Sequence, residues 1–425
     1  MNICIATYGS RGDVQPYAAL GKRLKEQGHD VTLATSVRFR TFVEELGLRY
    51  GYMSDDLLAI LDTDQGRDLV ENTTNLFRVV ERTLGMMKQL GPMQEALLQE
   101  CWEAAEAAGP DLIIFHPKAY GGPHFAEKLG VPVIMALPAP IFVPTREHPN
   151  MGFPDLKLGG GYNRMTYRLV NTLMGWSAGK HVKKWRQANG LPAGKGFDIL
   201  RTSGGEVIPV MHGVSRHVIP RPRDWPDTAV LTGYWFLDRD EGWAPPKRLA
   251  DFLAAGPAPV YIGFGSMAGR HPERLARIAV NALQKSGVRG ILSTGWGGMT
   301  PGHLPDTILQ IDQAPHDWLF PKMAAIVHHG GAGTTAAALR AGKPSVVVPF
   351  FGDQPFWGHR LETLGAGSAP IPRKTLGTGN LSRAIDRVLS ERAIRQNTDL
   401  LGRKIRNEDG AGNAVSFIED VMAGR

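Results

Sequence analysis

Short apolar runs alternate with segments of helical periodicity along most of the chain. Continuous apolar runs separated by helices are typical of parallel sheets that helices cover on both faces. In the first half we expect strands at NICIAT (2–7), DVTLAT (30–35), DLIIFH (111–116) and VPVIMALP (131–138), with a helix from Val14 to Gln27. In the second half we expect them at PVYIGFGS (259–266), GVRGILSTG (287–295), TILQID (307–312), AAIVHHG (324–330) and PSVVVPF (344–350). The pattern predicts an α/β protein with two Rossmann-like domains, each built on a parallel sheet.

The alternation is interrupted by YWFLDRDEGWAPPKRL (234–249), which is rich in proline, tryptophan and charge and therefore reads as a linker. We place the domain boundary there, with an N-terminal domain at residues 1–237 and a C-terminal domain at residues 238–425. The last helix of the chain could cross back to the N-terminal domain. In open parallel sheets ligands bind outside the carboxyl ends of the strands, so the loops after the strands are where chemistry is expected.

Composition narrows the function classes. A chain of 425 residues with 43% hydrophobic and 21% charged residues is globular and long enough for two domains. The formal charge of +7 suits an anionic ligand or peripheral contact with an anionic membrane, and no nucleic-acid-binding signature accompanies it. Two cysteines, no secretory leader and no apolar run long enough to span a membrane favour a cytoplasmic location.

The segment His329-Gly-Gly-Ala-Gly-Thr-Thr335 follows one predicted strand and leads into a helix. Backbone N–H groups and the positive end of a helix converge at such a point and make an anion site. Residues with little or no side chain let a phosphate approach the main chain. The competing interpretation is a tight turn in which the glycines serve only backbone geometry.

Two stretches resemble a known family. The span from Asp312 to Gly367 resembles the donor-binding signature of family 1 glycosyltransferases, and YGSRGDVQPYAALGKRL (8–24) resembles the N-terminus of sterol glucosyltransferases and bacterial antibiotic glycosyltransferases. The resemblance covers nearly the full length. It implies the GT-B fold, in which an acceptor domain and a nucleotide-sugar domain face each other across a cleft.

The resemblance also assigns donor-site residues. His329 would contact a donor phosphate, with Gly331, Ala332, Gly333 and Thr334 completing the diphosphate cradle. His328 would be a core residue, since alternation along a strand sends neighbouring side chains in opposite directions. Ser266 would be a second phosphate contact, or else an ordinary helix cap.

Further donor contacts carry more alternatives. Asp353 and Gln354 would hydrogen-bond the sugar hydroxyls, or form a polar turn. Gln313 and Ala314 stand where the plant enzymes have Trp-Ala, so the contact to the nucleotide base must differ. Trp296 is a candidate stacking residue for the base, and so is Trp318, although either could belong to the core. UDP is our first choice of nucleotide and TDP the second.

Inverting sugar transfer needs a base for the acceptor hydroxyl. Many relatives place a histidine in a His-x-x-Pro pattern, backed by an aspartate on a later strand. Here the pattern reads Asp13-Val14-Gln15-Pro16, and His116 stands at the later strand end. An ordinary aspartate, with a pKa near 4, is ionised at neutral pH. We therefore predict Asp13 as the base, with His116 tuning it or lining the acceptor pocket. The alternative is that Asp13 is only a helix N-cap.

The acceptor site is expected in residues 55–98 and 138–185, which are rich in methionine, phenylalanine and leucine. Phe142 and Phe153 are the named candidates, and a flat lipophilic alcohol is the expected acceptor.

The sequence as a whole predicts an inverting transferase that moves a hexose from UDP-glucose to a hydrophobic sterol, terpenoid or polyketide. No cofactor is expected besides this co-substrate, and no metal, since no Asp-x-Asp motif accompanies the phosphate site. One alternative is an NAD(P)-dependent oxidoreductase, because residues 331–336 fit a loose G-x-G-x-x-A. The other is a non-enzymatic protein that binds a sugar nucleotide or a lipid.

Overall fold

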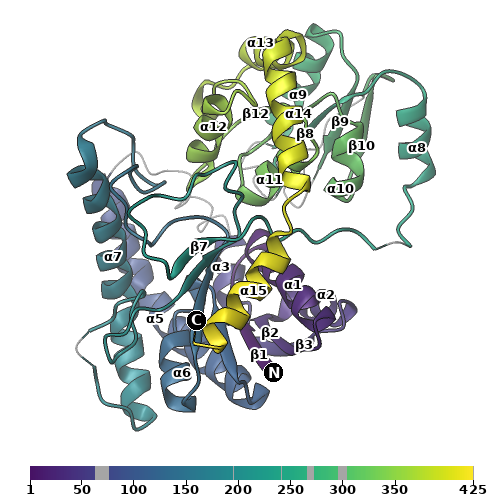
Figure 1. The fold of residues 1–425 in the computed structure, drawn as a ribbon. Helices are drawn as coiled ribbons and strands as arrows, with labels where there is room; N and C mark the ends of the chain where they lie inside the picture. The colour runs from purple at the N-terminus through teal and green to yellow at the C-terminus, as the bar shows by residue number, and fades with distance from the viewer. Residues whose placement is uncertain (63–75, 195, 241, 266–271, 295–303, 425) are drawn as a thin grey trace. The chain divides into compact units, whose positions relative to one another are not determined.

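The structure is a computed structural model of the 425-residue chain. It describes all residues except 63–75, 195, 241, 266–271, 295–303 and 425, and only the backbone of residues 61–62 and 76–89. The described chain forms two compact units (Figure 1). Unit 1 comprises Met1–Leu237 and Asp409–Arg425, and unit 2 comprises Asp238–Glu408.

Unit 1 is built on a parallel sheet whose seven described strands run in the order β3-β2-β1-β4-β5-β6-β7. The strands are β1 (Asn2–Ala6), β2 (Asp30–Ser36), β3 (Arg49–Met53), β4 (Leu112–Phe115), β5 (Val133–Leu137), β6 (Val210–His212) and β7 (Ala229–Leu231). The described helices are α1 (Arg11–Glu26), η1 (Val37–Phe39), α2 (Arg40–Glu45), α3 (Asp56–Asp62), α5 (Leu76–Ala108), η2 (Pro117–Ala119), α6 (Gly122–Leu129), α7 (Gly159–Ala188) and α15 (Gly410–Met422).

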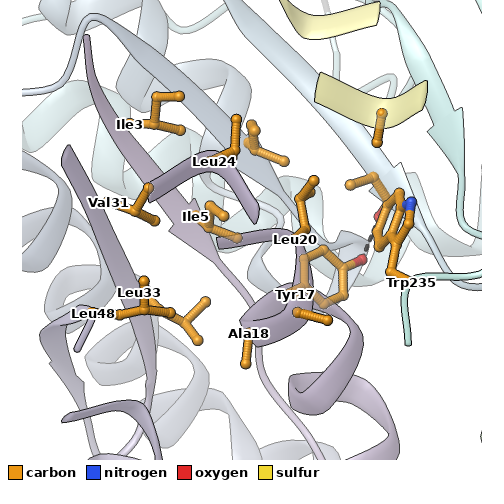
Figure 2. Close-up of a cluster of buried hydrophobic side chains, with 14 of the residues drawn as sticks. Ile3, Ile5, Tyr17, Ala18, Leu20, Leu24, Val31, Leu33, Leu48 and Trp235 are labelled. Carbon is orange, nitrogen blue, oxygen red and sulfur yellow. Dashed lines mark hydrogen bonds between the residues drawn. The ribbon is translucent and has the colours of Figure 1, made fainter. Parts of the chain in front are cut away.

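The core of unit 1 joins residues from opposite ends of the chain. Ile3 and Ile5 of β1 pack against Tyr17 and Leu20 of α1, as Figure 2 shows. Three side chains of α15 enter the same cluster: Ala414, Val415 and Ile418. Burial of this apolar face holds the C-terminal helix to unit 1.

Unit 2 is built on a parallel sheet whose five described strands run in the order β10-β9-β8-β11-β12. The strands are β8 (Val260–Gly263), β9 (Gly290–Ser293), β10 (Ile308–Ile311), β11 (Ala325–His328) and β12 (Ser345–Val347). The described helices are α8 (Lys247–Ala254), α9 (Pro272–Lys285), α10 (His316–Leu319), η4 (Phe320–Lys322), α11 (Ala332–Arg340), α12 (Gln354–Thr363), η5 (Arg373–Thr375), α13 (Thr378–Ser390) and α14 (Arg392–Arg406). The prediction of two α/β domains on parallel sheets is confirmed.

Each sheet has one position where the strand order reverses. In unit 1 the chain builds β1, β2 and β3 in one direction and then places β4 on the other side of β1. In unit 2 it builds β8, β9 and β10 and then places β11 on the other side of β8. The loops that follow such a pair of strands diverge and leave a crevice at their carboxyl ends. These two points position the candidate sites.

Candidate active site and donor cradle

The loop between β1 and α1 fixes the carboxylate of Asp13. Ser10 is the N-cap of α1 and Asp13 occupies the third helical position, so the helix begins three residues earlier than the sequence predicted. The Asp13 Oδ2 atom accepts hydrogen bonds from the backbone N–H of Ser10, at 2.8 Å, and from its hydroxyl, at 3.0 Å. Asp13 is therefore the capping-box partner of the N-cap and not the N-cap itself.

Gly9 makes this arrangement possible. Its φ of +140° lies in the region that glycine adopts readily, and a Cβ atom there would lie 2.2 Å from Asp13 Oδ2. Any other residue would push the carboxylate away from the loop. The glycine is thus required by the carboxylate as well as by the turn.

Two side chains from the loop after β4 approach the other carboxylate oxygen. Lys118 Nζ lies 2.7 Å from Asp13 Oδ1, and His116 Nε2 lies 4.0 Å from the same atom. The backbone N–H of Lys118 donates to His116 Nδ1 at 3.1 Å, so in the neutral ring the proton is on Nε2, which faces Asp13. Sequence reasoning missed Lys118, although it stands two positions after His116 at the same strand end.

Electrostatics separate the roles of these groups. Burial raises the pKa of Asp13, but the charge of Lys118, the proximity of His116 and the hydrogen bonds outweigh it and lower this pKa from its usual value. Burial lowers the pKa of His116 to about 4. At neutral pH the site thus holds an ionised carboxylate beside a neutral imidazole that presents an N–H. Asp13 can accept a proton on its carboxylate. The His116 nitrogen that faces Asp13, Nε2, already carries a proton and cannot.

In unit 2 the loop from β11 into α11 is open to an incoming anion. Gly331 is the N-cap of α11 and provides no side-chain cap, so the first backbone N–H groups of the helix point outward without an intrahelical partner. A Cβ at Gly333 would meet nothing within 4 Å, and a Cβ at Gly331 would lie 2.5 Å from His329 Nε2. Gly333 therefore leaves open space beside the helix terminus among the described residues, and the absence of a side chain at Gly331 lets the His329 ring lie against the terminus.

The two adjacent histidines have different surroundings, as the alternation predicted. His328 is fully buried, and its Nδ1 accepts the backbone N–H of Gly330 at 3.1 Å. His329 is partly exposed, and its Nδ1 has no hydrogen-bond partner among the described residues. Burial lowers the pKa of His329 to about 4, so the ring is neutral at pH 7 and offers one N–H. The two ring nitrogens face different loops: Nε2 lies beside Gly331 at the N-terminus of α11, and Nδ1 faces Gly265 at the end of β8. An N–H on Nε2 would be placed to contact an anionic ligand at the helix terminus.

Asp353 and Gln354 lie next to this loop at the start of α12. The Gln354 side-chain oxygen accepts the backbone N–H groups of Phe350 and Phe351, at 2.7 and 3.2 Å. Asp353 Oδ2 accepts the indole N–H of the buried Trp357 at 2.7 Å. A Cβ at Gly330 would lie 2.9 Å from the backbone oxygen of Gln354, so the two loops are in contact. Both side chains therefore hold the loop in shape. Their contact with the sugar hydroxyls stays a prediction.

The remaining predicted residues fall in different surroundings. Ser266 and Trp296 lie outside the described residues. Gln313 is exposed and Ala314 partly buried, in the loop between β10 and α10. Phe142 is nearly buried and Phe153 is half-buried.

One further histidine near β11, His316, was not predicted. His316, in the same loop region as Ala314, stacks on Phe320 with ring centroids 4.1 Å apart and lies edge-on to Tyr261. His316 is the first residue of α10, and the sequence signal was its place in the segment that follows β10.

Within the described part of the chain, no group of three or more histidine, cysteine or carboxylate side chains is placed to hold a metal ion. In the same residues no helix has both the length and the apolarity to cross a membrane.

Comparison with protein families gives two matches. Residues 3–145 match the family described as "Glycosyltransferase family 28 N-terminal domain". Residues 297–413 match the family described as "Erythromycin biosynthesis protein CIII-like, C-terminal domain". The first match includes Asp13 and His116, and the second includes the loop at His329.

Several characterised proteins are similar over almost the whole chain. Two sterol 3-beta-glucosyltransferases of Arabidopsis thaliana are each 36% identical over 98% of the chain, which spans 67% of one and 64% of the other. A sterol 3-beta-glucosyltransferase of Neurospora crassa is 37% identical, and the chain spans 27% of its length. These relatives are longer than the chain.

Solved structures share the fold at lower identity. The glycosyltransferase of kitacinnamycin superposes with a TM-score of 0.71 at 21% identity, covering 98% of each chain. The glycosyltransferase VinC, in complex with dTDP, superposes with a TM-score of 0.68 at 18% identity, covering 99% of each chain. The GT-B prediction is confirmed, and the oxidoreductase alternative finds no support in these comparisons.

Proposed function

Because the chain belongs to the GT-B glycosyltransferase family that includes the sterol 3-beta-glucosyltransferases, we propose that it transfers a hexose from a nucleotide sugar to a hydroxyl of a hydrophobic acceptor. UDP-glucose is the proposed donor, with a TDP-sugar as the alternative. A sterol is the first acceptor to test, ahead of terpenoids and polyketides. The observation that carries the mechanism is the carboxylate of Asp13, fixed at the strand-order reversal of unit 1 beside His116 and Lys118.

Asp13 is the proposed general base. The acceptor hydroxyl donates its proton to Asp13 while its oxygen forms the new bond to the anomeric carbon. The bond from that carbon to the diphosphate breaks, and the electron pair leaves with the diphosphate. Asp13 is a weak base because its pKa is lowered, so proton transfer occurs late, as the new carbon–oxygen bond forms. The capping-box bonds and Lys118 hold the carboxylate in one orientation.

The leaving diphosphate needs charge stabilisation that grows as the bond breaks. The open N-terminus of α11 and the imidazole N–H of His329 are the proposed donors. A bound diphosphate would favour the protonated imidazole and raise the pKa of His329 from about 4. These groups could neutralise the leaving group without a metal ion, and we expect transfer to persist in the presence of EDTA.

Cys4 and Cys101 are free and buried. Two unpaired thiols suit a reducing compartment, and a cytoplasmic location is part of the proposal.

The direct test is product formation. Purified protein incubated with UDP-glucose and a sterol should release UDP and give the sterol glucoside, which mass spectrometry detects. In parallel, UDP should raise the melting temperature more than TDP, ADP or NAD, since a ligand that binds only the folded state stabilises it. Stabilisation by NAD alone would reject the proposed donor. Stabilisation by UDP without any glucoside would favour a binding protein.

A further inference from the structure

Helix α7 presents a row of large apolar side chains to solvent. The relative exposures of Met165, Leu169, Leu173 and Trp176 are 55, 44, 55 and 67%. Their spacing of four, four and three residues places them on one face of the helix. Leu156 and Leu158, just before the helix, are 54 and 66% exposed. Single exposed apolar residues are ordinary, but an aligned row of this kind marks an interaction surface.

The other face of α7 is anchored in unit 1. Tyr167, Ala178, Val182 and Trp185 are buried, and α7 packs beside α5. The helix is therefore held in place by one face, and the apolar row is directed outward. We call the row of Met165, Leu169, Leu173 and Trp176 the α7 stripe.

The charged residues of α7 and its flanking sequence are all basic. From residue 156 to residue 197 the sequence contains no aspartate or glutamate, whereas α7 alone contains six lysines and arginines: Arg164, Arg168, Lys180, Lys183, Lys184 and Arg186. Lys180 and Lys183 continue the spacing of the stripe on the same helix face, and both are exposed. Arg186 and Lys184 are paired with Glu127 and Glu95 and are not available to a partner.

We propose that the α7 stripe, with Lys180 and Lys183, is a docking surface for an anionic membrane. An apolar face with tryptophan and leucine beside basic residues is the pattern of helices that lie in the membrane interface. Basic residues near such a surface each strengthen binding to anionic lipid. A second copy of the same surface would bring Lys180 and Lys183 close to the same lysines of the other copy, so charge complementarity favours the membrane over self-association. The proposal does not rest on the donor assignment. It competes with the predicted acceptor site for the same helix, because the α7 stripe lies within residues 138–185.

The test is sedimentation with vesicles of phosphatidylcholine, with and without phosphatidylserine. We expect the wild-type protein to sediment with the phosphatidylserine vesicles and to be released by high salt. Leu173→Ser with Trp176→Ser should reduce sedimentation with phosphatidylserine vesicles because apolar insertion is lost. Lys180→Ser with Lys183→Ser should weaken the apparent affinity for anionic vesicles by roughly tenfold or more, since two attractive charges are removed.

Matched controls lie on unit 2. Leu400→Ser removes another exposed leucine, and Lys374→Ser with Lys404→Ser removes the same charge from exposed positions elsewhere. Neither should change vesicle binding. Equal loss in the controls, or unchanged binding in the α7 variants, would overturn the proposal.

Two further measurements separate the competing occupants. If the wild type sediments as a dimer without vesicles and the serine variants as monomers, the α7 stripe is a self-association surface and the proposal is wrong. If the variants raise the KM for a water-soluble acceptor without vesicles, the stripe is part of the acceptor site and the proposal is again wrong.

Discussion

The two carboxylate oxygens of Asp13 have different partners, so the helix-capping role and the proposed role as a base do not exclude each other. One carboxylate oxygen completes the capping box of α1, and the other faces Lys118 and His116. The motif Asp-x-x-Pro identifies the residue but not this division of its oxygens. Lys118 was not predicted because a lysine two positions after a strand end carries no pattern of its own. Its role depends on the adjacency of β1 and β4, which only the folded sheet supplies.

Lys118 should set the pH range of transfer. Its charge lowers the pKa of Asp13, so Lys118→Met should raise that pKa and move the acid limb of kcat/KM to higher pH. Lys118→Arg keeps the charge and should leave the limb near its wild-type position. An NMR titration of the Asp13 carboxyl measures the same shift without turnover. An unchanged acid limb and an unchanged titration in Lys118→Met would remove Lys118 from the account.

His329 should matter for donor affinity. Replacement by alanine removes the ring N–H beside the α11 terminus, and loss of a hydrogen bond to a charged phosphate weakens binding by roughly ten- to a hundredfold. Calorimetry with UDP measures the effect. The wild-type affinity should also rise as pH falls toward the pKa of about 4, because the charged ring binds the diphosphate better. Wild-type affinity for UDP in His329→Ala would refute the assignment.

At the scale of elements, strands that lie within apolar runs were predictable and strands outside such runs were not. Apolar runs in the sequence coincide with the strands β1, β2, β4 and β5 and with all described strands of the unit 2 sheet. The missed strands are β3, which carries a glycine, and β6 and β7, which have three residues each. Such strands form because a preceding strand offers an edge to pair with, a tertiary effect that local pattern does not record.

The glycines of the donor loop should separate into two classes. Gly330 has a φ of +92°, and a Cβ there would lie 2.7 Å from Val347 Cγ1, so Gly330→Ala should destabilise unit 2 by roughly 1–3 kcal/mol. Gly333 lies in α11 with open space before it, so Gly333→Ala should keep the fold or stabilise it by up to ~1 kcal/mol.

Although Gly333→Ala should keep or raise stability, it should lower the affinity for UDP. The new methyl group would occupy the space proposed for the diphosphate. Thermal melting and UDP titration of both variants give the two quantities. A Gly333→Ala protein with full UDP affinity would move the donor away from the α11 terminus.

For the whole molecule, buried neutral histidines should make stability sensitive to acid. Burial lowers the pKa to about 4 for His116, His124, His212 and His329 and to about 3 for His328. The unfolded chain, with histidine pKa values near 6.5, binds more protons below that pH, so the free energy of unfolding should fall as pH drops from about 6.5 to 4. The lowered pKa of Asp13 acts in the same direction at lower pH.

Urea unfolding at pH 7.5 and pH 5 measures this loss. His212→Asn provides the control, because asparagine can donate to the Val230 oxygen as the imidazole Nδ1 does, but it does not titrate. The variant should lose less stability between the two pH values than the wild type. Equal stability of the wild type at both pH values would contradict the burial of neutral rings.

The account as a whole depends on Asp13 as a base, and Asp13→Asn tests it most directly. Asparagine keeps a side-chain oxygen that can accept the Ser10 N–H in the capping box, yet it cannot accept the acceptor's proton. We predict that glucoside formation falls by roughly 10²- to 10⁴-fold while UDP affinity and melting temperature stay near wild type. Full turnover in Asp13→Asn would show that the carboxylate serves only the helix.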